Sequence, residues 1–400
     1  MARTSRWLMI GAIAATAGCS LVFGFDDLLP SPATAGDGGA LDVAMDTPVG
    51  EPGSDAACPP GFDDCDDKPG CETLISGSDR NNCGACGRKC GTADCNSGAC
   101  SPEIIAVDDV LTIAADSTGV YWTTPAIADA DAGADADPAG RIVRSTPDGG
   151  DRKVLAIASL QSGTGTIALD GTHVYWATSD DKIRRVPKGG GAVETFSTAA
   201  SAGTIQRLAV FGDTAFVTVR SQPNSGRVDA IPLGNGPAIS IAQNQENPAS
   251  IVAGPQYVHW AIPDTDEAVR QVQSDGGMPA KFFSYGGSVQ YLATDGARLY
   301  WTHAKAGDGV FAADIPLSAG GKVDSLFKAD GAVGRGIAVD ATHVYWAADT
   351  SIERVRKDGT KHVTLARLSG GAAREIAIDD TFVYFVIGVS GSTGIARTPK

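Results

Sequence analysis

The chain has 400 residues, more than one ordinary domain, which predicts two or three structural units. Its formal net charge is −15 at pH 7, but residues 25–67 hold 11 acidic and no basic residues, so most of the excess lies there. The remainder is close to balanced and lacks a clustered Lys/Arg surface, so we expect no nucleic-acid partner.

The N-terminus predicts an export signal. Arg3 and Arg6 precede an apolar run that ends in small residues and is too short to span a bilayer. The sequence TAGC, ending at Cys19, resembles the lipobox of bacterial lipoproteins. This resemblance implies that residues 1–18 are removed, that Cys19 is acylated, and that the protein is anchored extracytoplasmically in the outer membrane, on its periplasmic or surface-exposed face. An ordinary signal peptide, cleaved near the same point, is the alternative.

Residues 19–57 are predicted to form a flexible acidic tether. The segment is poor in large apolar side chains, so burial cannot offset the entropy of ordering it. Its like charges repel one another and extend it. An acidic interaction tail is the alternative interpretation.

Residues 58–100 form a cysteine-rich module. It contains eight cysteines, and residues 101–400 contain none. An even number of cysteines in an exported chain predicts four disulfides, whose connectivity stays open among 105 pairings. Two alternatives are a zinc site on the closely spaced cysteines of CGACGRKC and a redox pair in CGAC; no histidine interleaves and no βαβ pattern surrounds them. The cysteines are Cys58, Cys65, Cys71, Cys83, Cys86, Cys90, Cys95 and Cys100.

The sequence of residues 64–100, with NCGACGRKC as its most specific part, resembles the Cys-rich module of Stig1-like proteins and of myxobacterial surface lipoproteins. The resemblance implies an extracytoplasmic module without known catalysis.

Residues 101–400 repeat a pattern of apolar strand, tight polar turn and Val-Tyr-Trp or a variant of it. The successive spacings of the last residue of the pattern are 54, 41, 43, 41, 45 and 39. A period of about 42 residues is typical of a four-stranded propeller blade. We therefore predict an all-β, seven-bladed propeller; a six-bladed ring is the alternative if the third module is an insertion. The seven positions are Trp122, Trp176, Val217, Trp260, Trp301, Trp346 and Phe385.

The second module predicts the strands of a blade. Its sequence separates into TIALD, VYWAT, KIRRVP and AVETFS, with turn residues between them. The last module stops at GIARTPK, residues 394–400, which corresponds to a third strand. IIAVD, residues 104–108, is predicted to supply the missing fourth strand and so to close the ring.

The repeated VYW resembles the YWTD propellers of lipoprotein receptors and the related NHL and TolB-like propellers. We interpret its aromatic residues as packing between blades, with carbohydrate stacking as the alternative.

Catalytic signals are weak. The sequence contains no G-x-S-x-G, H-E-x-x-H or P-loop pattern. Asp170, Asp340 and Asp379 each end an inner strand just before a turn, so we interpret them as turn caps and not as catalytic acids.

An insertion in the first blade, AIADADAGADADPAG, has four alternating carboxylates that could hold Ca²⁺. Compositional drift in an exposed loop is the preferred explanation, and no other cofactor is expected. The four residues are Asp129, Asp131, Asp135 and Asp137.

The loops that enter the inner strands of a propeller converge at one end of its channel, where we expect a candidate ligand rim. Converging arginines there could capture a carboxylate, phosphate or sulfated sugar; solvated arginines paired with local acids are the alternative. We predict a binding or scaffolding protein of the cell envelope whose partner is an unidentified protein, peptide or glycan. A propeller enzyme of the lactonase or lyase type is the alternative. The rim residues are Arg207, Gln290, Arg335, Arg374 and Glu375.

Overall fold

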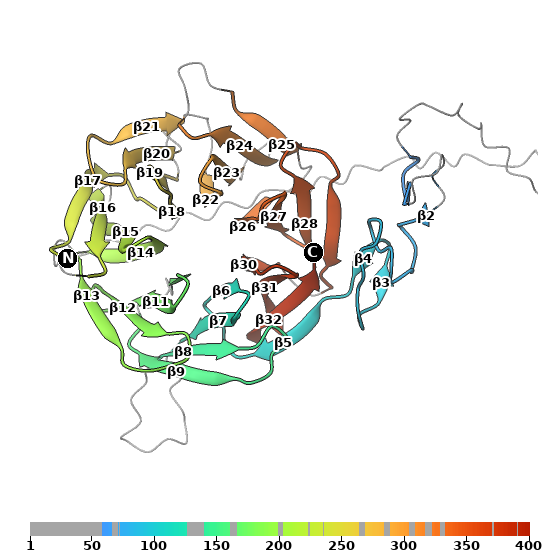
Figure 1. Cartoon of the computed structure of the whole chain (residues 1–400), viewed down its shortest axis with the longest axis horizontal. Helices are drawn as coiled ribbons and strands as arrows, with labels where there is room; N and C mark the ends of the chain where they lie inside the picture. Colours follow the sequence, from blue (N-terminus) through green and yellow to red (C-terminus); the bar gives the residue numbers. More distant parts are fainter. Residues whose placement is uncertain are drawn as a thin grey trace, which may run out of the picture. The chain divides into compact units, whose positions relative to one another are not determined.

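The described residues of the computed structural model form β-strands, turns and loops. They contain no helix long and apolar enough to cross a membrane. Seven four-stranded antiparallel sheets are arranged as blades around a common axis (Figure 1). The prediction of an all-β, seven-bladed propeller is thereby confirmed. The structure describes residues 58–65, 71, 73–125, 140–160, 166–198, 203–222, 225–234, 236–263, 269–283, 289–303, 309–316, 322–328, 333–369, 372–389 and 391–400.

Blades 1 to 4 follow one another along the chain, each from its inner to its outer strand. Blade 1 consists of β6 (Thr112–Asp116), β7 (Gly119–Thr124), β8 (Gly140–Ser145) and β9 (Lys153–Ala158). Blade 2 consists of β10 (Ile167–Leu169), β11 (His173–Ala177), β12 (Lys182–Pro187) and β13 (Glu194–Ser197). Blade 3 consists of β14 (Thr204–Phe211), β15 (Thr214–Gln222), β16 (Ser225–Pro232) and β17 (Ile239–Gln245). Blade 4 consists of β18 (Ile251–Ala253), β19 (Tyr257–Ala261), β20 (Val269–Gln273) and β21 (Ala280–Phe283).

Blades 5 and 6 repeat this order, and blade 7 takes its outer strand from the start of the propeller. Blade 5 consists of β22 (Val289–Thr294), β23 (Arg298–His303), β24 (Gly309–Asp314) and β25 (Asp324–Lys328). Blade 6 consists of β26 (Val333–Val339), β27 (His343–Ala348), β28 (Ser351–Arg356) and β29 (Val363–Arg367). Blade 7 consists of β30 (Arg374–Ile378), β31 (Phe382–Val389), β32 (Ser392–Pro399) and β5 (Glu103–Val107).

The third module, which has Val217 where most modules have Trp, forms a complete blade. Its four strands pair in the same order as those of the other blades. The six-bladed alternative is therefore wrong.

The ring is closed by pairing between the two ends of the propeller. Strand β5 pairs antiparallel with β32, with Val107 opposite Gly394 and Ala106 opposite Ile395. Arg397 Nε also donates a hydrogen bond to Glu103 Oε2 over 2.9 Å. The predicted closing strand is thus confirmed, shifted by one residue at each end.

The aromatic repeats pack between blades. Each of seven buried hydrophobic clusters joins two neighbouring blades. Tyr121 of blade 1, for example, packs in one cluster with Trp176 of blade 2, and Tyr384 of blade 7 packs with Trp122 of blade 1. These four side chains are fully buried, which excludes a role in stacking on carbohydrate and confirms the packing interpretation.

The aspartate that ends an inner strand caps the following turn. Asp170 Oδ1 accepts hydrogen bonds from the backbone amides of Thr172 and His173, and its other oxygen accepts one from the Tyr175 hydroxyl. Asp340 and Asp379 make the equivalent bonds in blades 6 and 7. Their interpretation as turn caps is confirmed.

At three interfaces a lysine of the following blade joins this turn. Lys357 Nζ of blade 6 lies 2.7 Å from Asp295 Oδ2 of blade 5, and it also lies over the Tyr300 ring. Lys188 pairs with Asp116, and Lys400 pairs with Asp340, in the same way. We call these three pairs the blade latches. They link neighbouring blades by charge in addition to the aromatic packing.

Acid should weaken the capped turns and latches. Burial alone would raise the pKa values of Asp170 and Asp295, but their hydrogen bonds outweigh it and lower each to about 2. The pKa of an aspartate in the unfolded chain is about 3.9. The contribution of the two ionised carboxylates to folding stability is therefore complete above that pH and is lost as the pH falls through about 2. We expect the melting temperature of a fragment of residues 58–400 to be flat down to about pH 4.5 and then to fall.

A matched pair of variants tests this assignment. Asp295→Asn should lower the melting temperature at pH 7 and reduce its further decline on acidification. Asp380→Asn, which changes an exposed neighbour of another cap, should leave the pH profile as in the wild type. Identical profiles for all three proteins would contradict the role given to Asp295.

The cysteine-rich module contains four disulfides and two small hairpins. The hairpins are β1 (Phe62–Asp63) with β2 (Thr73–Leu74), and β3 (Cys95–Asn96) with β4 (Ala99–Cys100). Cys83 and Cys86 of CGAC bond to different partners, so the redox-pair and zinc alternatives are wrong. The four disulfides are Cys58–Cys71, Cys65–Cys86, Cys83–Cys95 and Cys90–Cys100.

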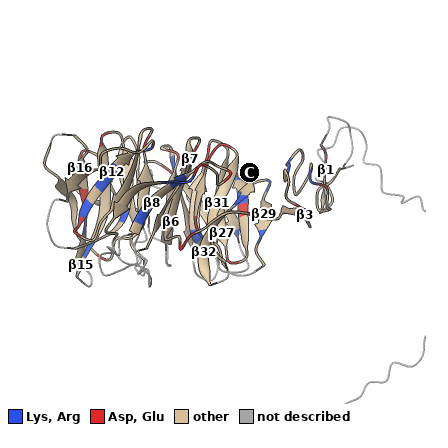
Figure 2. Ribbon diagram, turned by 90° about the horizontal axis from the view of Figure 1, so that it is seen from below, with Lys and Arg blue, Asp and Glu red and all other residues tan. Residues whose placement is uncertain are grey.

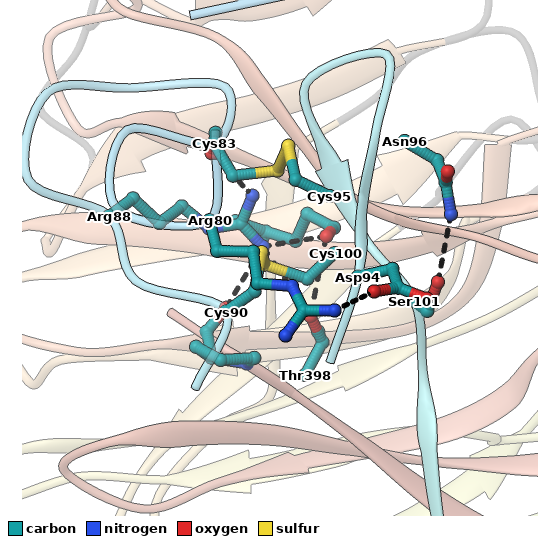
Figure 3. Close-up of a disulfide and its surroundings, with 12 residues drawn as sticks. Arg80, Cys83, Arg88, Cys90, Asp94, Cys95, Asn96, Cys100, Ser101 and Thr398 are labelled. Carbon is teal, nitrogen blue, oxygen red and sulfur yellow. Dashed lines mark hydrogen bonds and ion pairs between the residues drawn. A yellow bond between two sulfur atoms is a disulfide. The ribbon is translucent and has the colours of Figure 1, made fainter. Parts of the chain in front are cut away.

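Arg88 joins this module to the propeller. Figure 3 shows it beside the disulfides Cys83–Cys95 and Cys90–Cys100. Its buried guanidinium donates to the carbonyl oxygens of Leu365 in β29 (2.6 Å) and Pro399 in β32 (3.2 Å). Burial, together with the charge of Arg354, lowers the pKa of Arg88 to about 9, so the group is still charged at neutral pH.

Three predicted features lie outside the described residues: the signal segment with Cys19, the acidic tether, and the loop with its four alternating aspartates. Over the described blades, basic and acidic residues are interspersed (Figure 2).

Candidate functional site

Four inner strands bulge near their first residues. The register shifts between Ile205 and Arg207 in β14 and between Val289 and Tyr291 in β22. It also shifts in β26, between residues 333 and 337, and in β30, between residues 374 and 376. A bulge redirects side chains relative to a regular strand. All five predicted rim residues lie at or within these bulges.

Side-chain hydroxyls hold the first two bulges in place. Thr218 Oγ1 accepts a hydrogen bond from the Arg207 amide over 3.2 Å and donates one to the Ala249 carbonyl over 2.8 Å. Ser250 Oγ of blade 4 accepts a hydrogen bond from the Leu292 amide of blade 5 over 3.1 Å. The amides that the bulges release from regular pairing therefore have partners, and the backbone of both strands is fixed there.

A glycine lets the strands of blades 6 and 7 approach each other closely. Gly336 has a φ of +117°, and a Cβ atom there would lie 2.9 Å from the Ile376 amide nitrogen. The neighbouring Glu375 itself has a φ of +35°, which a non-glycine residue adopts at a cost of about 1–3 kcal/mol. Backbone strain at a bulge is typical of functional sites.

Two bulged strands bring opposite charges together across the axis. Arg207 Nη2 of blade 3 lies 3.3 Å from Glu375 Oε1 of blade 7. Arg207 Nη1 also donates to the Gln206 carbonyl over 3.1 Å. Burial raises the pKa of Glu375 above its ordinary value, and the charge of Arg207 offsets only part of this rise.

Tyr291 and Arg335 complete the group, and we call Arg207, Tyr291, Arg335 and Glu375 the axial cluster. Burial raises the pKa of Tyr291, as does Glu375, whereas the two arginines lower it. The net shift is upward, so the phenol is a hydrogen-bond donor at neutral pH. Arg335 is exposed.

A cavity of about 180 Å³ opens beside Arg207. It lies beside β18, the inner strand of blade 4, which has three residues whereas β14 has eight and β22 has six. Polar groups of three blades and two apolar residues form its walls. The lining residues are Gln206, Arg207, Ala249, Ser250, Pro263 and Tyr291.

The structure brings together some of the predicted rim residues and not others. Arg207 and Glu375 form an ion pair, and Arg335 lies close enough to change the pKa of the same tyrosine. Arg374 is exposed at the first position of β30, and the side chain of Gln290 lies outside the described part of the chain. Sequence reasoning missed Tyr291 and Ser250. Their role depends on a bulge and on a neighbouring blade, which the local sequence does not reveal.

The five histidines lie within blades, in packing or turn positions. His173 and His343 follow turn caps, and His259 occupies the position of a blade tyrosine, where burial lowers its pKa to about 4. His303 packs edge-on against Phe311, and His362 pairs with Glu353. Within the described ranges, the one group of His, Cys, Asp or Glu close enough to hold a metal is Cys83, Cys90 and Cys100, all in disulfides.

A larger cavity, of about 680 Å³, lies where the cysteine-rich module meets blades 6 and 7. Its lining comes from residues 96–104, 367–369 and 387–389. Arg367 is the charged residue in this lining. Three distant segments form it, so no single sequence motif predicts it.

Comparison with known proteins supports the fold alone. No family model and no curated protein matches the chain. Among solved structures, U3-55K is 11% identical with a TM-score of 0.55, and the alignment covers 74% of this chain and 98% of that one. The WD40 beta propeller domain of Doa1 is 13% identical with a TM-score of 0.51, covering 74% of this chain and 96% of that one.

Proposed function

We propose that this protein is a lipid-anchored recognition platform of the bacterial cell envelope, whose propeller binds a partner at the end of its axis that carries the axial cluster. The observation that supports a binding role most directly is the ion pair of Arg207 and Glu375 beside the 180 Å³ cavity. Both charged groups are partly removed from water and lie on bulged strands, and the backbone at Glu375 is strained, a combination that is costly for the fold alone.

The envelope location is supported by the sequence and by the module. The lipobox-like segment that ends at Cys19 supports acylation of that residue, and acyl chains would anchor the protein because each buried CH₂ contributes about 0.8 kcal/mol. Four disulfides in 43 residues suit an oxidising compartment outside the cytoplasm. An acidic tether between anchor and module would hold the propeller away from the membrane surface.

The binding role is tested by capture from envelope extracts with a fragment of residues 58–400. We expect Arg207→Gln to reduce recovery of the partner at least about tenfold, because arginine is among the residues that contribute most binding energy at interfaces. Arg356→Gln is the matched control, since this exposed arginine ends β28 at the opposite end of its blade. Equal recovery with both variants would show that the axial cluster is not the binding site.

The anchor is tested separately in cells. Cys19→Ala should move the protein from the membrane fraction to the soluble extracytoplasmic fraction, because the anchor and the folded parts occupy different segments. The melting temperature of the folded part should not change. Retention of the variant in the membrane fraction would refute lipid anchoring through Cys19.

A propeller enzyme of the lactonase or lyase type is the alternative. Over the part of the chain that the structure describes, its support is limited to Glu375, whose pKa is raised by burial and which lies beside an arginine and without a second carboxylate in contact.

A further inference from the structure

The Arg207–Glu375 pair is a single-point contact. The pair consists of one contact of 3.3 Å, whereas a guanidinium and a free carboxylate can form two parallel hydrogen bonds. The side chains are also 34% and 25% exposed, so water reaches both. A carboxylate able to meet the guanidinium face to face would bind it better than Glu375 does.

The backbone of Glu375 has a conformation that is unfavourable for a non-glycine residue. Its positive φ carries a cost, and its approach to blade 6 requires the missing side chain of Gly336. Burial disfavours its charged form, with incomplete compensation from Arg207. If the Glu375 side chain turned away from the arginine toward water, its carboxylate would regain hydration.

The adjacent cavity has the size and lining for a single acidic group. At about 180 Å³ it is smaller than pockets that enclose whole ligands, which are roughly 300–1,000 Å³. The Arg207 guanidinium and the Tyr291 phenol supply donors, and Ala249 and Pro263 supply apolar walls. The positive charge of the exposed Arg335 nearby disfavours a cationic group.

We propose that this cavity binds a carboxylate group of the partner. In the free protein the Glu375 carboxylate pairs with the Arg207 guanidinium, and the partner's carboxylate displaces it on binding. The inference rests on the proposed function, and it names the chemistry that the axial cluster recognises. The carboxylate can belong to a peptide C-terminus, an acidic side chain or a uronic acid, because all three present the same planar anion. The presence of Glu375 shows that a carboxylate fits against this guanidinium.

The experiment measures binding of small probes to the fragment of residues 58–400 by ligand-observed NMR. We expect N-acetylglycine to bind in the millimolar range and its amide, N-acetylglycinamide, to bind at least about tenfold more weakly. Glu375→Gln should tighten N-acetylglycine about five- to tenfold, because the competing charge is removed while the shape is kept. Inorganic phosphate serves as a second anion and should bind more weakly than N-acetylglycine.

Two variants keep the test decisive if one of them folds poorly. Arg207→Gln should abolish binding of N-acetylglycine, and Tyr291→Phe should weaken it while both members of the ion pair remain present. Arg356→Gln should bind as the wild type does. Equal affinity for the acid and the amide, or an unchanged affinity in Glu375→Gln, would overturn the proposal.

Failure of this inference can be told apart from failure of the proposed function. If Arg207→Gln loses the captured partner but N-acetylglycine and its amide bind alike, the axial cluster is a binding site and the carboxylate assignment is wrong. If N-acetylglycine binds as described but partner capture is unaffected by Arg207→Gln, the carboxylate site stands and the platform function at this end is wrong. A partner that still binds after its C-terminus is amidated would point to an acidic side chain or uronic acid.

Discussion

A propeller fragment that begins at Leu111 should unfold at least ~10 °C below a fragment that begins at Ser101, because it lacks the strand that closes the ring. Strand β5 contributes four register pairs to β32, and Ile105 and Ala106 pack against the cluster between blades 7 and 1. Its loss leaves an unpaired edge on β32 and exposes apolar side chains of that cluster. The measurement is thermal unfolding followed by circular dichroism, with light scattering to detect aggregation.

Two glycine variants test the same contact without shortening the chain. A Cβ atom at Gly394 in β32 would lie 2.6 Å from the Ala106 carbonyl oxygen, so Gly394→Ala should displace β5. At Gly388 in β31 the same atom would meet nothing within 4 Å, so Gly388→Ala should melt as the wild type does. Equal melting temperatures for the two fragments, and for the two variants, would show that β5 does not hold the ring closed.

The repeat made the fold predictable. The VYW segment of one blade packs against that of the next, so the sequence recurs at the length of a blade. The number of blades could be predicted even where Val217 replaces Trp, because Val217 packs in the same way against Tyr175. The closing strand was predictable for a related reason: the last module lacked one strand, and residues 104–108 had no other assignment. Periodicity carries this information because every blade meets the same packing requirement.

The candidate site was predictable only in part. Position along the repeat indicated which residues lie near the axis, and Arg207 and Glu375 do meet there. Position along the repeat could not indicate Tyr291. A one-residue bulge redirects the side chains beside it, and whether a bulge forms depends on the pairing with the neighbouring strand. The disulfide pairing was equally hidden, because spacing alone does not select among 105 connectivities.

The contact of Arg88 with the propeller was also beyond sequence reasoning. Its acceptors lie 277 and 311 residues along the chain, and they are backbone carbonyls, which carry no side-chain signature. From the sequence, an arginine in a disulfide-rich module is expected to be an exposed surface charge. The structure shows Arg88 buried against blades 6 and 7.

Arg88→Met in the fragment of residues 58–400 should lower the melting temperature by roughly 5–10 °C. The substitution keeps most of the aliphatic length but removes every donor to the carbonyls of Cys83, Leu365 and Pro399. A buried acceptor left without its donor costs about 1–3 kcal/mol, so the loss for the three carbonyls is roughly 3–5 kcal/mol. In a domain of more than 250 residues each kcal/mol shifts the melting temperature by about 2 °C. Arg80→Met is the matched control, because Arg80 is exposed and pairs within the module with Asp94.

The stability lost in Arg88→Met cannot exceed the free energy with which the whole cysteine-rich module docks on the propeller. If Arg88 holds the module to β29 and β32, its loss can cost no more than complete undocking, so Arg88→Met should not melt below the fragment that begins at Ser101. Hydrogen exchange should quicken in β29 and in the last residues of β32 but not in blades 2 to 4, which Arg88 does not touch. If instead Arg88→Met and Arg80→Met melt together at the wild-type temperature, Arg88 does not hold the module to the propeller.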